Sequence, residues 1–289
     1  MKRKLTVKGK TFVWGERAYV MGILNLTSDS FSGDGLGVDL EKIIKQARTF
    51  AEHGADILDI GGESTNPYHS NPVTAEEELR RVIPAIRAIV AVTDLPISID
   101  TYKPEVARAA FEAGANIIND IHGLEDPQMQ ELAAITGAPV IAMHMRGTPT
   151  TMQQMTDYNG DVVGALLEYF KLRVTELEVA GIARDKLIID PGFGFAKTIE
   201  QNYELLNNLR TFKTLDLPLL VGISRKGFIG RGMVETGQEP PPPHERVLGT
   251  AAAVAIAIAK GADIVRVHDI PEIMGVVRLA NTITRSYMQ

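Results

Sequence analysis

The sequence predicts an α/β protein built as a single (β/α)8 TIM barrel, and three observations support this fold class. A helical stretch, a small turn and a short β-branched run recur along the chain, with near-identical copies at 51–62, 111–121 and 257–269. Looser copies lie at 133–144 and 179–192. A glycine near each helix end suits a left-handed cap, and the apolar run after it suits a strand buried on both faces. Regular alternation of this kind is typical of βαβ units around a parallel sheet.

Eight strand patterns and eight helical patterns alternate along the 289 residues, which is the number that closes a barrel. The expected strands are 20–25, 57–61, 96–100, 117–121, 139–144, 187–190, 219–223 and 264–268. The expected helices are 39–53, 75–92, 103–114, 128–136, 160–180, 199–213, 244–260 and 271–286. A doubly wound sheet is the alternative, but the even spacing and uniform composition favour one domain over 1–289. Within it we expect a short N-terminal β-hairpin at 1–19 and the barrel at 20–286.

The composition excludes several classes of function. Lys and Arg total 30 against 36 Asp and Glu, so the net charge is −6, whereas a general nucleic-acid binder needs a basic face. The chain has no cysteine, which excludes disulfides, thiolate metal sites and a cysteine nucleophile. The basic N-terminus lacks the apolar run of a signal peptide, and the most apolar stretch, 251–259, is too short to span a bilayer. We therefore expect a cytoplasmic protein with no nucleic-acid or membrane partner.

Polar side chains stand at the carboxyl ends of nearly all the expected strands, where barrel enzymes place their chemistry. Asp120 and Asp269 also suit helix caps or turns, and Asp59, which lies inside its strand, also suits a paired core carboxylate. His144 and His268 likewise have a purely structural interpretation. Burying so many polar groups costs roughly a few kcal/mol each unless they are paired. A polar ligand shared by the strand ends would account for them.

Two groups of strand-end residues indicate two parts of this ligand. Asn25, Arg266 and His268 lie on the first and last strands, which become neighbours when a barrel closes, and they suit a phosphate or pyrophosphate with Mg²⁺. The second group suits the donors and acceptors of a polar heterocycle. It consists of Asp100, Asn119, Asp190 and Lys226, with Met143, Phe193 and Phe195 as slot walls. The sequence thus predicts a barrel enzyme for a heterocyclic phosphate ester.

These residues also lie in a series of longer motifs. The motifs are MGILNLTSDSFSGDG (21–35), GGEST (61–65), SIDT (98–101), GANIINDI (114–121), DPGFGFAKT (190–198), VGISRKGFIG (221–230) and RVHD (266–269). In this order, and over nearly the whole chain, they resemble the dihydropteroate synthase family. The resemblance implies a (β/α)8 barrel, a homodimer and a sulfonamide target. It also implies a transferase of folate synthesis that joins p-aminobenzoate to 6-hydroxymethyl-7,8-dihydropterin diphosphate and releases pyrophosphate.

The resemblance also implies residue roles. Asn25 would hold Mg²⁺ beside the pyrophosphate, Thr65 would reach the pterin diphosphate, and Ser224 would help to receive the p-aminobenzoate carboxylate. The other expected substrate-binding residues are Asp100, Asn119, Met143, Asp190, Phe195, Gly222, Lys226, Arg266 and His268. Of these, Asp100, Asn119, Asp190 and Lys226 would hold the pterin. Arg266 and His268 would bind the diphosphate. The residues expected to act in catalysis are Asp100, Asp190, Lys226, Arg266 and His268.

The chain departs from the family pattern in its two loops. Ser28 replaces a proline of the first loop, and Asn66 and Tyr68 replace an arginine and a glycine of the second. Asn66 removes a guanidinium from a loop near an anionic substrate. This leaves open a catalytically silent paralogue that binds pterin. A methyltetrahydrofolate–corrinoid methyltransferase is a further alternative, although the residues 224–226 and the Arg266–His268 pair favour a diphosphate substrate.

The expected chemistry is dissociative. The carbon–oxygen bond to pyrophosphate breaks first, the resulting pterin-methyl cation is delocalised into the dihydropterin ring, and the arylamine nitrogen then attacks. Cationic and N–H groups stabilise the departing charge, and Asp100 and Asp190 stabilise the cation if they are ionised.

Overall fold

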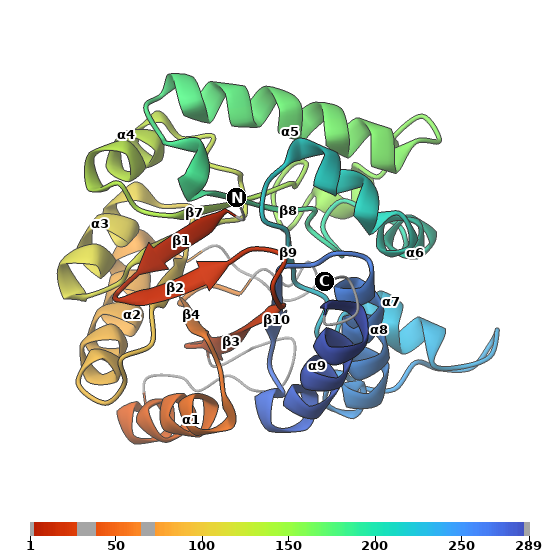
Figure 1. Cartoon of the computed structure of the whole chain (residues 1–289), viewed down its shortest axis with the longest axis horizontal. Helices are drawn as coiled ribbons and strands as arrows, with labels where there is room; N and C mark the ends of the chain where they lie inside the picture. Colours follow the sequence, from red (N-terminus) through yellow and green to blue (C-terminus); the bar gives the residue numbers. More distant parts are fainter. Residues whose placement is uncertain (1–2, 28–38, 65–72, 286–289) are drawn as a thin grey trace.

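The computed structural model of the chain describes residues 3–27, 39–64 and 73–285, and within these residues the strands form the expected barrel (Figure 1). Eight parallel strands hydrogen-bond in the order β8-β7-β6-β5-β4-β3-β10-β9. Their bounds are β3 (Tyr19–Asn25), β4 (Ile57–Gly61), β5 (Ile97–Asp100), β6 (Ile117–Asp120), β7 (Val140–Met143), β8 (Leu187–Asp190), β9 (Leu220–Val221) and β10 (Ile264–Val267). A parallel bridge between Ile189 and Leu219 joins β8 to β9, so the sheet closes. The predicted fold class is confirmed.

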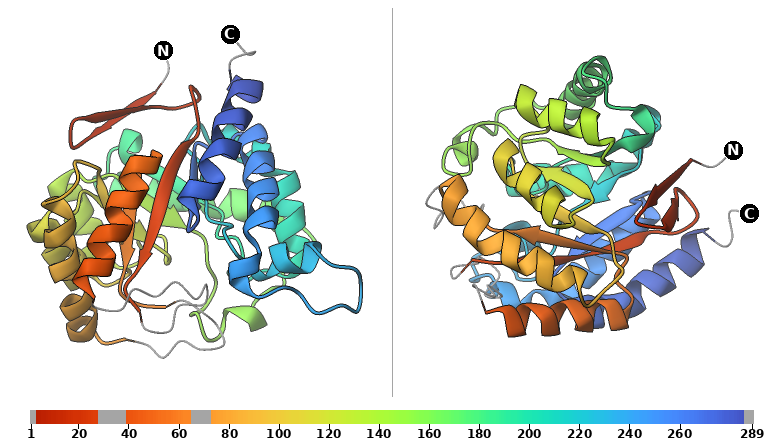
Figure 2. Two further views of the ribbon diagram at one scale, coloured as in Figure 1. Left: turned by 90° about the horizontal axis from the view of Figure 1, so that it is seen from below. Right: turned by 90° about the vertical axis from the view of Figure 1, so that its left-hand side faces the viewer.

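Helices cover the outside of the barrel (Figures 1 and 2). Their bounds are α1 (Leu40–His53), α2 (Ala75–Val90), α3 (Pro104–Ala113), α4 (Pro127–Thr136), α5 (Val162–Val179), α6 (Ile199–Asn207), α7 (Gly227–Gly232), α8 (Val247–Ala259) and α9 (Ile270–Arg285). The glycine turns of the repeated pattern behave as predicted at α1 and α3. Gly54 and Gly114 end these helices with φ of +98° and +117°, and their N–H groups donate to carbonyls of the last turn.

Two parts of the helical layer differ from the sequence-based prediction. The helix expected over 199–213 ends at Asn207, where a 3₁₀ helix, η3 (Leu209–Leu215), takes over. The Asn208 amide donates to the Glu204 carbonyl at 2.9 Å, and such side-chain bonds to backbone compete with a continuing helix. The short helix α7 was not predicted, because its sequence GFIGRG contains three glycines and has low helix propensity. Its buried Phe228 and Ile229 hold it against the barrel.

The N-terminal hairpin closes one end of the barrel. Its strands β1 (Lys4–Val7) and β2 (Lys10–Val13) pair antiparallel, as predicted (Figure 2). Apolar side chains of the hairpin form one buried cluster with inward-facing side chains of the barrel strands. The cluster contains Leu5, Val7, Phe12, Trp14, Tyr19, Met21, Ile57, Ile117, Ile141, Ile188, Leu220 and Ile264. The strand residues lie at or near the amino ends of their strands, so this end is filled with apolar side chains and the polar carboxyl ends face the other way.

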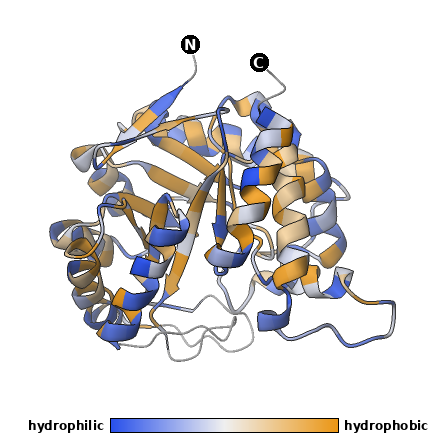
Figure 3. Cartoon of the chain, turned by 60° about the horizontal axis from the view of Figure 1, so that its bottom comes forward, coloured by the Kyte–Doolittle hydropathy of each residue, from blue (hydrophilic) through white to orange (hydrophobic). Residues whose placement is uncertain are grey.

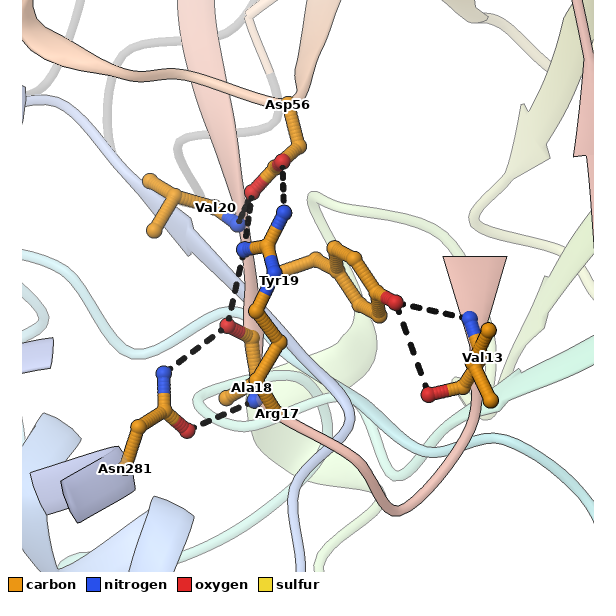
Figure 4. A network of polar contacts seen from close by, with 7 residues as sticks. All are labelled: Val13, Arg17, Ala18, Tyr19, Val20, Asp56 and Asn281. Atoms are coloured by element: carbon orange, nitrogen blue, oxygen red, sulfur yellow. Dashed lines mark hydrogen bonds and ion pairs between the residues drawn. The ribbon is translucent and has the colours of Figure 1, made fainter. Parts of the chain in front are cut away.

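A polar network fixes the chain as it leaves the hairpin and enters β3 (Figure 4). Arg17 forms a bidentate ion pair with Asp56, and Asp56 also accepts the Val20 N–H at 2.8 Å. The Asn281 side chain of α9 accepts the Ala18 N–H at 2.7 Å. The Tyr19 hydroxyl accepts the Val13 N–H at 2.7 Å. These contacts join β3, β4 and α9 at the amino end, away from the strand-end polar residues.

The main apolar core lies between the sheet and the helices. Hydrophobic residues dominate the strands, whereas most helices mix hydrophobic and hydrophilic residues along their length (Figure 3). Phe50, Phe170 and Phe212 are among the largest fully buried side chains of this layer. In the part of the chain that the structure describes, no helix combines the length and apolar character needed to cross a membrane.

Candidate active site

Arg266 lies at the centre of a polar cluster at the carboxyl ends of the strands. Its Nε donates to Asp59 Oδ2 at 2.5 Å, and its Nη2 donates to Asp100 Oδ2 at 2.6 Å. The Asn119 amide donates to the same Asp59 oxygen at 3.1 Å. These four residues come from β10, β4, β5 and β6, so closure of the barrel brings together side chains up to 207 positions apart. The guanidinium has five N–H donors, of which these two bonds use two.

The charges in this cluster are strongly coupled. Burial raises the pKa of Asp100 to about 7, although the charge of Arg266 pulls in the opposite direction. Burial also acts to lower the pKa of Arg266, but Asp59 and Asp100 more than reverse that effect, so its pKa lies above the usual value. Arg266 is therefore a fixed cation held by two carboxylates, a suitable partner for an anionic group of a ligand.

Asp190 and Lys226 form the second half of the site. Asp190 Oδ1 accepts the Gly192 N–H at 2.8 Å, and burial raises the pKa of this carboxyl. Gly222 leaves room beside it, since a Cβ added there would lie 3.7 Å from Asp190 Oδ2 and 3.9 Å from Arg266 Cδ. The Lys226 ammonium lies 4.0 Å from the centre of the Phe195 ring. Gly222 thus lies between the side chains of Arg266 and Asp190, one from each half of the site.

The comparisons with known proteins agree with this geometry. The profile of the pterin binding enzyme family matches residues 21–268. The dihydropteroate synthase of Synechocystis is 48% identical over 282 residues, covering 97% of this chain and 95% of its own length. That of Escherichia coli is 47% identical and covers 90% of each chain.

The chain belongs to the dihydropteroate synthase family. It is therefore an enzyme, a transferase of folate synthesis. Solved structures of the family match over nearly the whole chain. A Yersinia pestis dihydropteroate synthase in complex with a sulfonamide drug has a TM-score of 0.90 and 41% identity, covering 98% of this chain and 99% of its own. A Xanthomonas albilineans dihydropteroate synthase with 4-aminobenzoic acid has a TM-score of 0.86 and 41% identity, covering 98% of both chains.

Among the expected family residues, Ser224 and His268 lie together. The Ser224 hydroxyl contacts His268 Nδ1 at 2.9 Å and accepts the His268 N–H at 3.3 Å. This contact joins the loop after β9 to the loop after β10. The Ser224 hydroxyl, which is expected to bind the p-aminobenzoate carboxylate, is therefore also bonded to His268. This contact orients the His268 imidazole.

The expected slot walls form a small apolar cluster beside the polar residues. Met143 and Phe195 are buried with Ile121, Met145 and Met152. Phe193 packs elsewhere, in the main core against Phe228 with ring centres 6.0 Å apart. The prediction that Phe193 lines the slot is therefore wrong, since its ring faces the helix layer.

The residues expected in the two loops lie outside the described residues, and Asn25, before the first loop, lies within them. Thr65, Asn66 and Tyr68 of the second loop, and Ser28 of the first, fall outside the described residues. Asn25 is described and ends β3, beside Gly61 in the parallel register.

Two charged residues near the site are not among the expected substrate-binding or catalytic residues, although the sequence leaves Asp59 open as a strand-end or core carboxylate. Asp59, fully buried, holds both Arg266 and Asn119. Lys197, also buried, contacts His144 Nδ1 at 3.1 Å and donates to the carbonyls of Gly192 and Phe195 at 3.0 and 2.8 Å. Burial, with the nearby Lys197 charge, lowers the pKa of His144 to about 2, so this histidine is neutral.

The pH dependence of the enzyme tests the state of Lys226. Burial lowers the pKa of Lys226 to about 7, and Asp190 only partly opposes this effect. Because the lysine loses its charge as the pH rises through this value, we expect kcat/KM, which reports the free enzyme, to fall on the alkaline side of about pH 7. In Lys226→Arg the charge persists, so this alkaline limb should disappear from the normalised profile. An unchanged limb in that variant would assign the titration to another group.

Proposed function

We propose that this cluster joins p-aminobenzoate to 6-hydroxymethyl-7,8-dihydropterin diphosphate by dissociative loss of pyrophosphate. The observation that carries the proposal is the position of Arg266 between Asp59 and Asp100, next to Asn119, Asp190 and Lys226. One site thereby offers a fixed cation for a diphosphate and acceptors for a heterocycle with several N–H groups.

The pterin half of the proposal rests on chemical complementarity. An ionised Asp190 can accept two adjacent N–H groups of a guanidine-like ring edge, and its own Oδ1 is already oriented by the Gly192 N–H. Asn119 both donates and accepts, and Asp59 fixes which way its amide points. Lys226 supplies a donor to a ring oxygen or nitrogen. Met143 and Phe195 supply the apolar faces of the slot.

The same residues suit the dissociative step. Arg266 and His268 stabilise the negative charge that develops on the departing pyrophosphate. When ionised, Asp100 and Asp190 stabilise the positive charge left on the pterin methylene and ring. One such pair of unit charges, at about 4 Å and an effective dielectric near 20, is worth roughly 4 kcal/mol, or about a thousandfold in rate. The arylamine attacks as the free amine, so no strong base is required.

Mg²⁺ is proposed as the partner of the diphosphate. The amide oxygen of Asn25 is a hard donor at the carboxyl end of β3, and Mg²⁺ commonly keeps its waters and substrate phosphates with only one or two protein oxygens. In the described ranges no three His, Asp or Glu side chains group around a metal position. This is consistent with a Mg²⁺ ion that has few protein ligands. When bound, the ion would neutralise diphosphate charge. Asn25→Ala should raise the Mg²⁺ concentration required for half-maximal rate, and an unchanged requirement would remove Asn25 from this role.

The order of bond breaking can be tested with the amine. If the carbon–oxygen bond breaks first, kcat changes little across a set of ring-fluorinated 4-aminobenzoates, because the amine enters after the slow step. If the amine displaces pyrophosphate directly, kcat falls in step with amine basicity, and the dissociative proposal fails. Pyrophosphate release and 7,8-dihydropteroate formation are measured together, so that trapping by water is seen as an excess of pyrophosphate.

Replacement of Asp190 tests the pterin half of the site. Asp190→Asn keeps the shape of the side chain but replaces one acceptor oxygen with a donor, which opposes the N–H groups of the ring edge. We expect the affinity for the pterin substrate to fall at least about tenfold, the equivalent of roughly 1.4 kcal/mol. Isothermal titration calorimetry measures this affinity, and an unchanged value would contradict the assignment of Asp190.

We also propose a homodimer that pairs through α8 and α9. These two helices pack side by side and leave apolar side chains exposed on their outer surface. Leu248 is 79% exposed, Leu279 62%, Ile283 59% and Ile256 46%. Burial of such a patch favours association. Sedimentation should give a dimer for the natural chain and a monomer for Leu248→Glu combined with Leu279→Glu; a monomeric natural chain would contradict the proposal.

The remaining proposals concern organisation and location. Hairpin and barrel are proposed as one domain over 1–289, since hairpin side chains complete the apolar cluster at the amino end of the strands. We place the protein in the cytoplasm because its sequence has no cysteine and its substrates belong to folate synthesis. Separate expression of residues 20–289 tests the first proposal, and the fractionation of the natural host tests the second.

A further inference from the structure

Arg225 stands between two expected site residues in an unusual backbone conformation. Its φ is +58°, a left-handed value that residues other than glycine rarely adopt. On one side of it, Ser224 contacts His268 at 2.9 Å. On the other side, Lys226 lies against the Phe195 ring at 4.0 Å. A strained backbone conformation at a functional site persists only when several contacts with the surrounding structure hold it in place.

Contacts of both its side chain and its main chain with described residues hold this conformation. The Arg225 guanidinium forms a bidentate ion pair with Asp269, with Nε to Oδ2 at 3.0 Å and Nη2 to Oδ1. The Arg225 N–H donates to the Thr250 hydroxyl at 3.0 Å, and the Arg225 carbonyl accepts from Arg246 at 2.9 Å. Thr250 and Arg246 both belong to the start of α8. The main chain of Arg225 is therefore held at both its donor and its acceptor.

The ion pair also joins two loops of the site. Asp269 follows His268 directly, and Arg225 follows Ser224 directly. The Ser224–His268 contact and the Arg225–Asp269 pair are therefore two successive links between the loop after β9 and the loop after β10. The side chains of the pair are only 12% and 8% exposed, so this link is screened little by solvent. From sequence alone, Asp269 had the simpler interpretation of a helix cap.

We propose that Arg225 is a positioning residue, whose ion pair with Asp269 holds the left-handed turn that directs Ser224 to His268 and Lys226 to the pterin slot. This inference rests on the family's reaction and adds a residue that acts through its neighbours. Its guanidinium is not proposed to touch the reacting atoms.

The chain offers a matched control at the opposite end of the same two strands. Lys213 donates to the buried Asp263 at 2.5 Å, and Asp263 in turn accepts the Leu219 N–H at 3.0 Å. The ion pair links η3 to the residue before β10, and Asp263 in turn joins the amino ends of β9 and β10, near the hairpin and away from the site. Removing it tests what the loss of an ion pair at the amino end of these strands does to the enzyme in general.

The experiment compares Arg225→Ala, Arg225→Gly and Lys213→Ala with the natural chain, using steady-state kinetics and thermal unfolding. Alanine loses the ion pair and retains the cost of a left-handed φ, whereas glycine adopts this φ freely. We expect Arg225→Ala to lower kcat/KM for the pterin substrate by about thirtyfold, within the range that backbone strain of this kind allows. Arg225→Gly should recover most of that loss. Lys213→Ala should lower Tm and change kcat/KM by less than about twofold.

Each other result overturns the proposal. Equal kcat/KM losses in Arg225→Ala and Lys213→Ala would make the pair merely structural. An Arg225→Gly variant as poor as Arg225→Ala would show that the pair does not act through the backbone. If Arg225→Ala fails to fold, Asp269→Asn carries the test, because it keeps the shape of the side chain. It should lower kcat/KM by about fivefold, and a wild-type value would contradict the proposal.

Discussion

Arg266→Ala should lose at least about a thousandfold in kcat/KM, which corresponds to roughly 4 kcal/mol of transition-state stabilisation. The departing pyrophosphate loses its fixed cation. In addition, Asp59 and Asp100 lose their shared partner, so the variant should also be less stable by about 3–5 kcal/mol, the usual effect of breaking a buried ion pair. Urea unfolding and pyrophosphate release measure the two effects separately.

A second variant separates stability from chemistry. Arg266→Ala combined with Asp59→Asn removes one of the two carboxylates that are left without a partner, so it should regain part of the lost stability. It should regain none of the rate, because the cation is still absent. A double variant that recovers activity, or an Arg266→Ala variant that keeps more than about a tenth of the natural rate, would show that Arg266 has only a structural role.

Lys226→Met should also lose at least about a thousandfold in kcat/KM, because the charge that faces the substrate disappears while the length of the side chain is kept. The stability of this variant should not fall with its activity. In the folded chain burial lowers the pKa of Lys226 to about 7, against 10.5 for the ordinary group, so the unfolded chain binds the proton more tightly at neutral pH. Methionine removes this penalty, and Tm at pH 7 should equal or exceed that of the natural chain.

The pH dependence of this gain provides the control. As the pH rises from about 7 toward 10.5, the unfolded natural chain also loses its lysine proton, so the advantage of Lys226→Met should shrink. Lys213→Met, at the amino end of the barrel and away from the site, should show no such gain. A Lys226→Met variant that is less stable than the natural chain at pH 7 would show that the ammonium contributes more to the fold than burial costs it.

The barrel could be predicted from sequence because its signals are local. The strands are short apolar runs, several of them follow a helix that ends near a glycine, and these patterns repeat at even spacing. The short helix α7 was not predicted because its three glycines oppose a helix, and burial of Phe228 and Ile229 against the barrel helps to stabilise it. The end of α6 at Asn207 was not predicted either, because the helical periodicity of the sequence continues into η3.

The site was predictable where a residue stands at a strand end, and less so where its role depends on a distant partner. Asp100, Asn119, Asp190 and Arg266 were identified by their positions. Asp59 was left open as a core carboxylate, because it lies inside β4 and its partner Arg266 is 207 residues away. Lys197 gave no local signal either, since its contact with His144 spans 53 residues. Phe193 was misplaced because sequence does not tell which aromatic side chain of the 190–198 motif faces the slot.

The most direct test is the formation of 7,8-dihydropteroate from 6-hydroxymethyl-7,8-dihydropterin diphosphate and p-aminobenzoate with Mg²⁺, followed together with pyrophosphate. The natural chain and Asn66→Arg are assayed side by side, since Asn66 lies where the family pattern has arginine. We expect the natural chain to form both products in equal amounts, which means that the second loop functions with asparagine. A natural chain that binds the pterin substrate but releases no pyrophosphate, while Asn66→Arg does, would contradict the account and identify a catalytically silent pterin-binding protein.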